Sequence, residues 1–278
     1  MTYNLLEGSG WMLKIYQVDS FTAVPFGGNP AGVCLLDEEI DERLYPRIAS
    51  EMNLSETAFV RPGDEKNTYG LRWFTPKVEV KMCGHATLAT AWIHFTELGV
   101  KGEISYETLS GKLGVRYVDG KIEMNFPSDN PYRVRIDEML GRITGVEGEC
   151  YYSSLTEKLL YIISSKSKLE NLSFDFSLLE TCDFGYTVKG LIVSSPGDEK
   201  FDFYSRYFAP WVGIDEDPVT GSAHTVLGPF WSEKLGRKNL RACQLSSRRG
   251  ELDLELLPNS RILILGKAVT VIRGTISI

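Results

Sequence analysis

The chain has 278 residues, of which 43% are hydrophobic and 24% charged, a composition typical of a soluble globular protein with one large or two medium domains. Its formal net charge of −7 argues against a nucleic-acid or membrane partner, although a local site can still bind a small anion. No apolar run is long enough to span a bilayer and no signal-peptide pattern opens the chain, so the expected location is the cytoplasm.

Residues 1–11 are predicted to be a flexible N-terminal extension, because they end in a run of small and polar residues. A first domain is predicted over residues 12–127. Its expected first elements are strands at 13–18 and 31–36, joined through a glycine loop at 27–32, and a helix at 38–52. Strands at 56–60 and 69–74, a buried helix at 84–96 and a three-stranded meander at 104–108, 113–118 and 122–126 are expected to follow. The glycine loop does not match a dinucleotide-binding fingerprint.

Two prolines make residues 127–131 the predicted linker, since they interrupt both strand and helix. A second domain is predicted over residues 132–267. Its expected elements are a helix near 136–144, strands near 150–153, 158–163, 188–195 and 201–208, a helix that opens at Gly221, and a strand-rich tail from 240 to 278. Pro229 lies within the second buried helix and is expected to kink or shorten it.

Two stretches of the chain repeat one pattern. Residues 72–88 and 206–227 each contain an aromatic segment ended by proline, then a loop, then a glycine that opens a run of small and apolar residues. Gly84 to Thr96 and Gly221 to Trp231 contain no Asp, Glu, Lys or Arg, and a helix that is apolar on every side is buried. The sequence therefore predicts an α+β protein with an internal duplication, in which each half wraps a sheet around one central helix.

The first turn of a helix has unpaired N–H groups and a partial positive charge, so it can bind a carboxylate or phosphate. If the two halves face each other, Gly84 and Gly221 bring two such helix N-termini to one ligand. The predicted partner is therefore a small anionic substrate.

Four motifs occur in order: Phe26-Gly27-Gly28-Asn29-Pro30-Ala31-Gly32-Val33, Asn53-Leu54-Ser55-Glu56-Thr57-Ala58-Phe59-Val60, Cys83-Gly84-His85-Ala86-Thr87 and Asp217-Pro218-Val219-Thr220-Gly221-Ser222-Ala223. From about Met12 onward the chain thereby resembles the PhzF-like family of phenazine-biosynthesis-type isomerases. The resemblance implies the diaminopimelate epimerase-like fold, with two similar domains, each a mixed or antiparallel barrel-like sheet around a central buried helix. It also implies that the strand near 268–278 returns to the first domain. A homodimer agrees with the family, although nothing in the sequence pattern demands one.

Two acidic residues are the main catalytic candidates. Glu56 opens an apolar strand, where desolvation would raise its pKa toward the working pH, although an isolated glutamate is more often a surface residue. Asp217 on its own suits a turn or a helix start. The family resemblance makes Glu56 the catalytic glutamate and places Asp217 across the cleft from it. Two such carboxyl groups can divide proton removal and proton return between them.

His85 is the third catalytic candidate. The family resemblance suggests that it binds the substrate or relays a proton. A lone histidine on an apolar helix is, however, more often a core residue. Ser222 occupies the analogous place in the second copy and either caps its own helix or adds to the anion site. The predicted substrate-binding residues are Asn29, Cys83, Gly84, Gly221 and Ser222.

No metal site and no cofactor are predicted. The five cysteines are widely spaced and form no CxxC pair, and the three histidines form no HExxH pair. Nothing in the sequence calls for nicotinamide, flavin or pyridoxal phosphate.

The leading functional hypothesis is a cofactor-independent isomerase or epimerase that moves a proton on a small carboxylate-bearing metabolite bound between the two domains. One alternative is nucleophilic chemistry at Cys83, with His85 or His224 as the base. The other is a non-catalytic scaffold of the same fold that binds a small anion or a protein partner.

Overall fold

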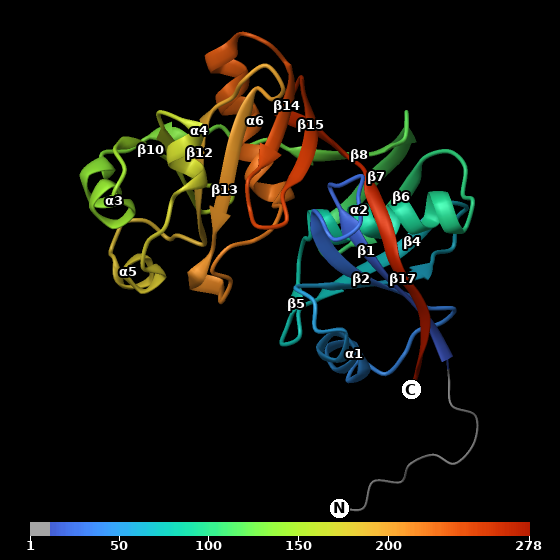
Figure 1. Cartoon of the computed structure of the whole chain (residues 1–278). Helices are drawn as coiled ribbons and strands as arrows, with labels where there is room; N and C mark the ends of the chain where they lie inside the picture. The colour runs from blue at the N-terminus through green and yellow to red at the C-terminus, as the bar shows by residue number, and fades with distance from the viewer. Residues whose placement is uncertain (1–11) are drawn as a thin grey trace, which may run out of the picture.

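The computed structural model of the chain describes residues 12–278, so the extension predicted at 1–11 lies outside the described residues. The strands form one continuous hydrogen-bonded sheet of 17 strands, which curls into two lobes (Figure 1). Helices cover or fill the curled sheet in both lobes. The predicted α+β class with two similar halves is therefore confirmed.

The N-terminal lobe is a curled sheet around one central helix. Its strands are β1 (Met12–Ser20), β2 (Asn29–Leu35), β3 (Thr57–Pro62), β4 (Thr68–Phe74), β5 (Glu79–Val80), β6 (Ile104–Thr108), β7 (Gly111–Val118) and β8 (Lys121–Pro127), joined by the last strand of the chain, β17 (Ala268–Ser277). Helix α1 (Leu44–Met52) lies outside the sheet, and helix α2 (Gly84–Trp92) fills its centre and continues as the π-helical turn η1 (Ile93–Glu97).

The C-terminal lobe repeats this plan. Its strands are β9 (Tyr132–Arg133), β10 (Gly148–Ser153), β11 (Lys158–Ile163), β12 (Gly190–Pro196), β13 (Phe203–Phe208), β14 (Asn239–Gln244), β15 (Gly250–Leu257) and β16 (Arg261–Gly266). Helix α6 (Gly221–Leu235) is the central helix, and the outer elements are α3 (Asp137–Thr144), α4 (Lys166–Glu170), α5 (Phe176–Thr181) and the 3₁₀ turn η2 (Pro210–Val212).

Strand pairing shows the duplication directly. In the N-terminal lobe the successive strand pairs are β1–β2, β2–β3, β3–β4, β4–β6, β6–β7 and β7–β8. Their directions are, in this order, antiparallel, parallel, antiparallel, parallel, antiparallel and antiparallel. The series from β10 to β16 has the same order. The first strand of each series has one further antiparallel partner: β1 pairs with β17, and β10 pairs with β9. Antiparallel pairing of β8 with β16 joins the two lobes.

The two central helices are buried as the charge-free sequence predicts. Every residue of α2 from His85 to Ala91 is buried, and so is α6 from Ala223 to Gly228. Their first residues meet: a Cβ built on Gly84 or Gly221 would lie 3.5 Å from the Cα of the other glycine. The helix N-termini therefore converge at the junction of the lobes.

The predicted start of the first outer helix is wrong for a reason that involves proline, and the second central helix is not shortened at Pro229. Helix α1 begins at Leu44 and not near residue 38, because Pro46 has no N–H to donate to a preceding turn and fits only the first turn of a helix. Helix α6 continues through Pro229 to Leu235. The carbonyl of Thr225, which the N–H of residue 229 would normally reach, accepts instead from the backbone N–H of Asp129 at 3.0 Å.

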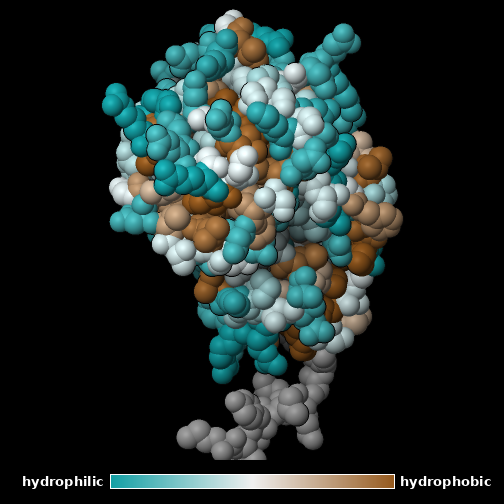
Figure 2. Space-filling view, turned by 60° about the vertical axis from the view of Figure 1, so that its left-hand side comes forward, coloured by the Kyte–Doolittle hydropathy of each residue, from teal (hydrophilic) through white to brown (hydrophobic). Residues whose placement is uncertain are grey.

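Hydrophilic side chains dominate the upper part of the face shown in Figure 2, and apolar side chains form smaller patches between them. Among residues 12–278, no helix has both the length and the apolar character that crossing a membrane requires.

We expect Leu88→Ala to destabilise the protein by about 2–5 kcal/mol, because Leu88 is fully buried on α2 and its removal leaves a cavity. Leu98→Ala is the matched control, since this leucine is 46% exposed, and we expect its effect to stay below about 0.5 kcal/mol. Urea denaturation measures both effects. Equal destabilisation by the two substitutions would contradict a central role for α2.

Candidate active site

A carboxylate and an imidazole from the N-terminal lobe form the first half of the site. Glu56 directly precedes β3, and its backbone carbonyl accepts from the N–H of Gly32 at 3.1 Å, which fixes the position of the residue. Its Oε2 lies 3.4 Å from Nε2 of His85, the second residue of α2. The two side chains are only 14% and 7% exposed. The pair therefore lies in a nearly enclosed space beside the helix N-terminus.

Cys83 adjoins this pair as the residue before α2. Its Sγ lies 3.5 Å from Nδ1 and 4.0 Å from Nε2 of His85. Burial raises the pKa of the Cys83 thiol well above its usual value, and the nearby charge of Glu56 raises this pKa further. Within the site as it stands, Cys83 is therefore a protonated thiol and a poor nucleophile.

Asp217 from the C-terminal lobe forms the second half of the site. Nδ2 of Asn29 donates to Oδ1 of Asp217 at 2.8 Å and to the carbonyl of Val219 at 2.9 Å, and the Thr220 hydroxyl donates to the other carboxylate oxygen. Burial raises the pKa of Asp217, while His85 and the Thr220 hydrogen bond act in the opposite direction. Because Asn29 belongs to the first lobe, it holds Asp217 across the junction.

The helix N-termini complete the site. The residues before α2 and α6 are Cys83 and Thr220, and neither side chain caps its helix. Gly84 and Gly221 present only backbone there, so an anionic group can approach the first-turn N–H groups closely. Ser222, the second residue of α6, is half-buried beside them. The structure thus brings all the residues predicted for the site to one region at the junction of the lobes.

Comparison with known proteins shows the family of the chain. The family model of phenazine biosynthesis-like proteins, PhzC-PhzF, matches residues 18–274. The chain belongs to the PhzC-PhzF family. A phenazine biosynthesis-like domain-containing protein of Bos taurus is 44% identical over 285 residues, covering 95% of this chain and 99% of its own length. An uncharacterized isomerase of Pseudomonas aeruginosa is 42% identical over 268 residues, covering 95% of this chain and 98% of its own length.

Solved structures show the same family and fold. The crystal structure of a PhzF-family protein of Enterococcus faecalis has a TM-score of 0.90 at 36% identity, covering 96% of this chain and 100% of its own. A hydroxyproline epimerase of Agrobacterium vitis has a TM-score of 0.57 at 9% identity, covering 97% of this chain and 94% of its own, and this likeness shows the fold alone. The resemblance to the PhzF isomerases and the epimerase-like fold predicted from the sequence are confirmed.

Sequence reasoning missed a buried residue that positions Asp217 in this PhzF-family chain. Gln244, at the end of β14, donates from Nε2 to the backbone carbonyl of Asp217 at 2.7 Å and accepts from the N–H of Thr220 at 2.9 Å. It is fully buried, so these hydrogen bonds hold the loop before α6 in one conformation. No local pattern around Gln244 points to this role, because its partners lie 24 and 27 positions earlier in the sequence.

Arg248 plays a similar part for the glycine loop and was also missed. It donates to the carbonyl of Gly28 at 2.9 Å, to that of Gly27 at 3.0 Å and to Oδ1 of Asp19 at 2.9 Å. Asp19 is completely buried, so this ion pair crosses between the lobes with little solvent around the carboxylate. Arg248 therefore fixes the loop that carries Asn29.

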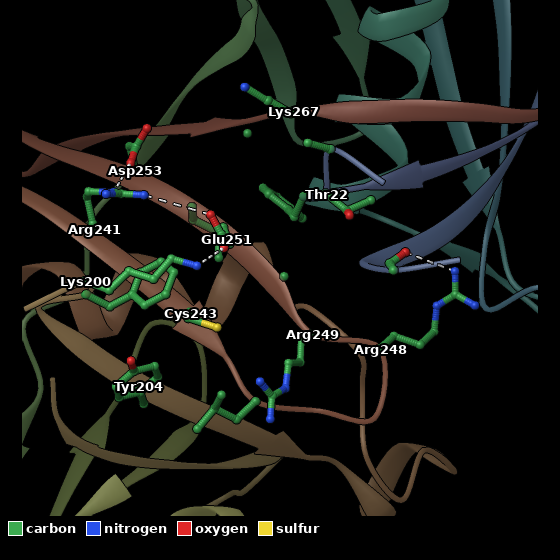
Figure 3. Close-up of a pocket in the computed structure, with 18 of the residues that line it drawn as sticks. Thr22, Lys200, Tyr204, Arg241, Cys243, Arg248, Arg249, Glu251, Asp253 and Lys267 are labelled. Atoms are coloured by element: carbon green, nitrogen blue, oxygen red, sulfur yellow. Dashed lines mark hydrogen bonds and ion pairs between the residues drawn. The ribbon is translucent and has the colours of Figure 1, made fainter. Parts of the chain in front are cut away.

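Arg248 also lines a groove of about 630 Å³ between the outer face of β13, β14 and β15 and residues of the N-terminal lobe that include Thr22 and Lys267 (Figure 3). Tyr204, Cys243 and Glu251 lie side by side there, because strand pairing places them in one row. None of the predicted site residues lines this groove. The groove and the candidate active site are therefore separate features of the family member.

The two remaining histidines do not join the site as bases. Nδ1 of His224 lies 2.8 Å from the carbonyl of Thr220, and burial lowers the pKa of His224 to about 4. His94 contacts the hydroxyl of Tyr106 at 2.6 Å, and burial lowers its pKa to about 4 as well. Both are neutral core residues at physiological pH.

The free energy of unfolding of the protein should depend on pH through the buried carboxyl group of Asp217. Burial raises the pKa of Asp217 in the folded state, so the folded protein binds this proton more tightly than the unfolded chain does. The stability that this tighter proton binding contributes is complete at low pH and is lost as pH rises through the raised pKa. We therefore expect Asp217→Asn to gain stability relative to wild type as pH rises from the ordinary pKa of aspartate, about 4, through the raised pKa of Asp217 in the folded protein.

Urea denaturation at several pH values checks this expectation. Asp215→Asn is the matched control, because Asp215 is exposed and lies two positions away. It should change little across the same range. A stability difference between Asp217→Asn and wild type that is flat or shrinks as pH rises would show that burial of the Asp217 charge carries no penalty.

Proposed function

We propose that this PhzF-family protein is a cofactor-independent isomerase or epimerase that moves a proton on a small carboxylate-bearing metabolite. The observation that carries the proposal is the meeting of Glu56, His85 and Asp217, contributed by both lobes, at two helix N-termini that touch through Gly84 and Gly221. Family membership supports the isomerase class.

The helix N-termini supply the electrostatic part of this chemistry. A proton next to a carboxylate is weakly acidic, so its removal requires stabilisation of the negative charge that develops on the substrate. Backbone N–H groups at Gly84 and Gly221 are fixed before the reaction and have no side-chain cap that competes with a bound anion. They therefore bind the substrate carboxylate and stabilise the added charge in the transition state.

The two carboxyl groups then divide the proton transfer. Glu56 removes the substrate proton, the electron pair left behind spreads into the substrate, and a proton returns to a different position or face. Asp217 suits the return step, because burial raises its pKa and favours the protonated form. His85, 3.4 Å from Glu56, binds the substrate or relays the proton, and Asn29 keeps Asp217 oriented through its 2.8 Å hydrogen bond.

Glu56→Gln is expected to lower proton exchange by about 10²–10⁴-fold, because glutamine keeps the size of the side chain but cannot accept the proton. The assay incubates a panel of small aliphatic and aromatic carboxylic acids in D₂O and follows deuterium incorporation by NMR. Glu51→Gln, on the exposed face of α1, is the control and should exchange at the wild-type rate. Full activity of a folded Glu56→Gln protein would remove Glu56 from the mechanism.

Thiol chemistry at Cys83 is the rival enzyme class, and the geometry disfavours it. The thiol is 7% exposed, and burial holds its pKa well above the usual value. We expect Cys83→Ser to keep deuterium exchange within about tenfold of wild type and iodoacetamide to inactivate the protein slowly. Loss of exchange as complete as in Glu56→Gln, together with fast inactivation, would favour a nucleophilic Cys83 instead.

A non-catalytic scaffold is the second rival. Such a protein needs no acid or base at the helix N-termini, whereas this chain keeps Glu56, His85 and Asp217 together with the residues that orient them. The buried charge of Asp217 costs stability, which a scaffold has no reason to retain. This cost supports the catalytic proposal.

A further inference from the structure

The groove in Figure 3 carries a charge opposite to that of the whole chain. Seven of its lining residues are lysine or arginine, whereas only three are acidic: Asp198, Glu251 and Asp253. Two further acids, Asp19 and Glu170, pair with lining arginines but leave cations in excess. The chain as a whole has a net charge of −7. A cationic groove in such a chain concentrates small anions at one place.

Three of these cations have hydrogen-bond donors that no carboxylate of residues 12–278 uses. The side chains of Arg241 and Arg249 each come no closer than 3.6 Å to a carboxylate oxygen, which is too long for a hydrogen bond. Lys267 is exposed and forms no ion pair within the part of the chain that the structure describes. Their N–H groups are therefore available to an anionic ligand.

A buried aromatic ring fixes the position of two cations in the groove. Nζ of Lys200 lies 4.7 Å from the centroid of the Phe201 ring, and the guanidinium carbon of Arg241 lies 5.4 Å from it. Phe201 is only 5% exposed, so its ring cannot move away from these contacts. Cation–π attraction at such distances holds both charges beside one ring before a ligand binds, which lowers the entropy that binding costs.

The cations reach the groove from both of its sides. Lys200, Arg241 and Arg249 belong to the C-terminal lobe, whereas Lys267 lies between β16 and β17, where its carbonyl accepts from the backbone N–H of Thr22 at 3.2 Å. Figure 3 shows Lys267 and Thr22 across the groove from Lys200 and Arg249. The volume of about 630 Å³ is that of a site for a small molecule.

We propose that this groove binds a small polyanion, a molecule that carries two or more phosphate or carboxylate groups. Lys267 binds one anionic group. Lys200, Arg241 and Arg249 bind the other, and two groups are needed because the cations lie on both sides of the groove. The site is separate from the candidate active site, so the proposal goes beyond the proposed isomerase function.

Titration calorimetry of the full-length protein tests the site with two probes, pyrophosphate and citrate, at one fixed ionic strength. We expect at least one probe to bind. Lys267→Glu is expected to weaken that binding by about tenfold or more, because an attracting charge becomes a repelling one. Lys14→Glu is the matched control, since Lys14 is exposed on β1, does not line the groove and changes the net charge by the same amount. Its affinity should stay within about twofold of wild type.

Lys200→Glu tests the other side of the groove and should weaken binding as Lys267→Glu does. Tighter binding of pyrophosphate identifies phosphate as the preferred group, and tighter binding of citrate identifies carboxylate. Failure of both probes to bind, or an equal loss of affinity in Lys267→Glu and Lys14→Glu, would overturn the proposal. A probe that binds only at the helix N-termini would give unchanged affinity in Lys267→Glu, with the same consequence. None of these measurements follows turnover, so their outcome does not depend on the proposed isomerase function.

Discussion

Contact between two helix starts is the constraint on which the rest of the structure depends. A Cβ on Gly84 would already reach within 3.5 Å of Gly221, so the backbones approach as closely as they do because neither residue has a side chain. The approach places two sets of unpaired N–H groups at one point, where they act together on an anion. Both helices are buried over their first turns, from His85 to Ala91 in α2 and from Ala223 to Gly228 in α6, so each lobe must curl its sheet around one of them. The proposed anion site and the hydrophobic core are therefore built from the same two helices.

The site concentrates groups that are costly to bury, and the surrounding residues limit the cost. Asp217 loses its water on folding but gains hydrogen bonds from Asn29 and Thr220, while Gln244 holds the backbone on both sides of it. Arg248 and the buried Asp19 do the same for the glycine loop. Such support keeps the Asp217 carboxyl group, the proposed proton donor, in a fixed position with a raised pKa, which solvent exposure would not allow.

Local patterns in the sequence predicted the parts of this structure that depend on local physics. The charge-free runs after Gly84 and Gly221 are buried helices, and the alternating segments of both halves are strands. Pro46 accounts locally for the later start of α1, whereas α6 continues through Pro229 because the N–H of the distant Asp129 satisfies the carbonyl that proline leaves free. Gln244 and Arg248 were missed because their partners are close only after folding.

Strand pairing across the two halves explains how the site stays assembled. β17, the last strand of the chain, pairs with β1 in the N-terminal lobe, and β8 pairs with β16 of the other lobe. Because the chain crosses between the lobes after β8 and again after β16, a rotation of one lobe away from the other would strain both crossings and break the β8–β16 hydrogen bonds. The side-chain contacts from Asn29 to Asp217 and from Arg248 to Asp19 oppose the same rotation. The two carboxyl groups are therefore held in position by the fold itself, which would lower the reorganisation that the proposed proton transfer requires.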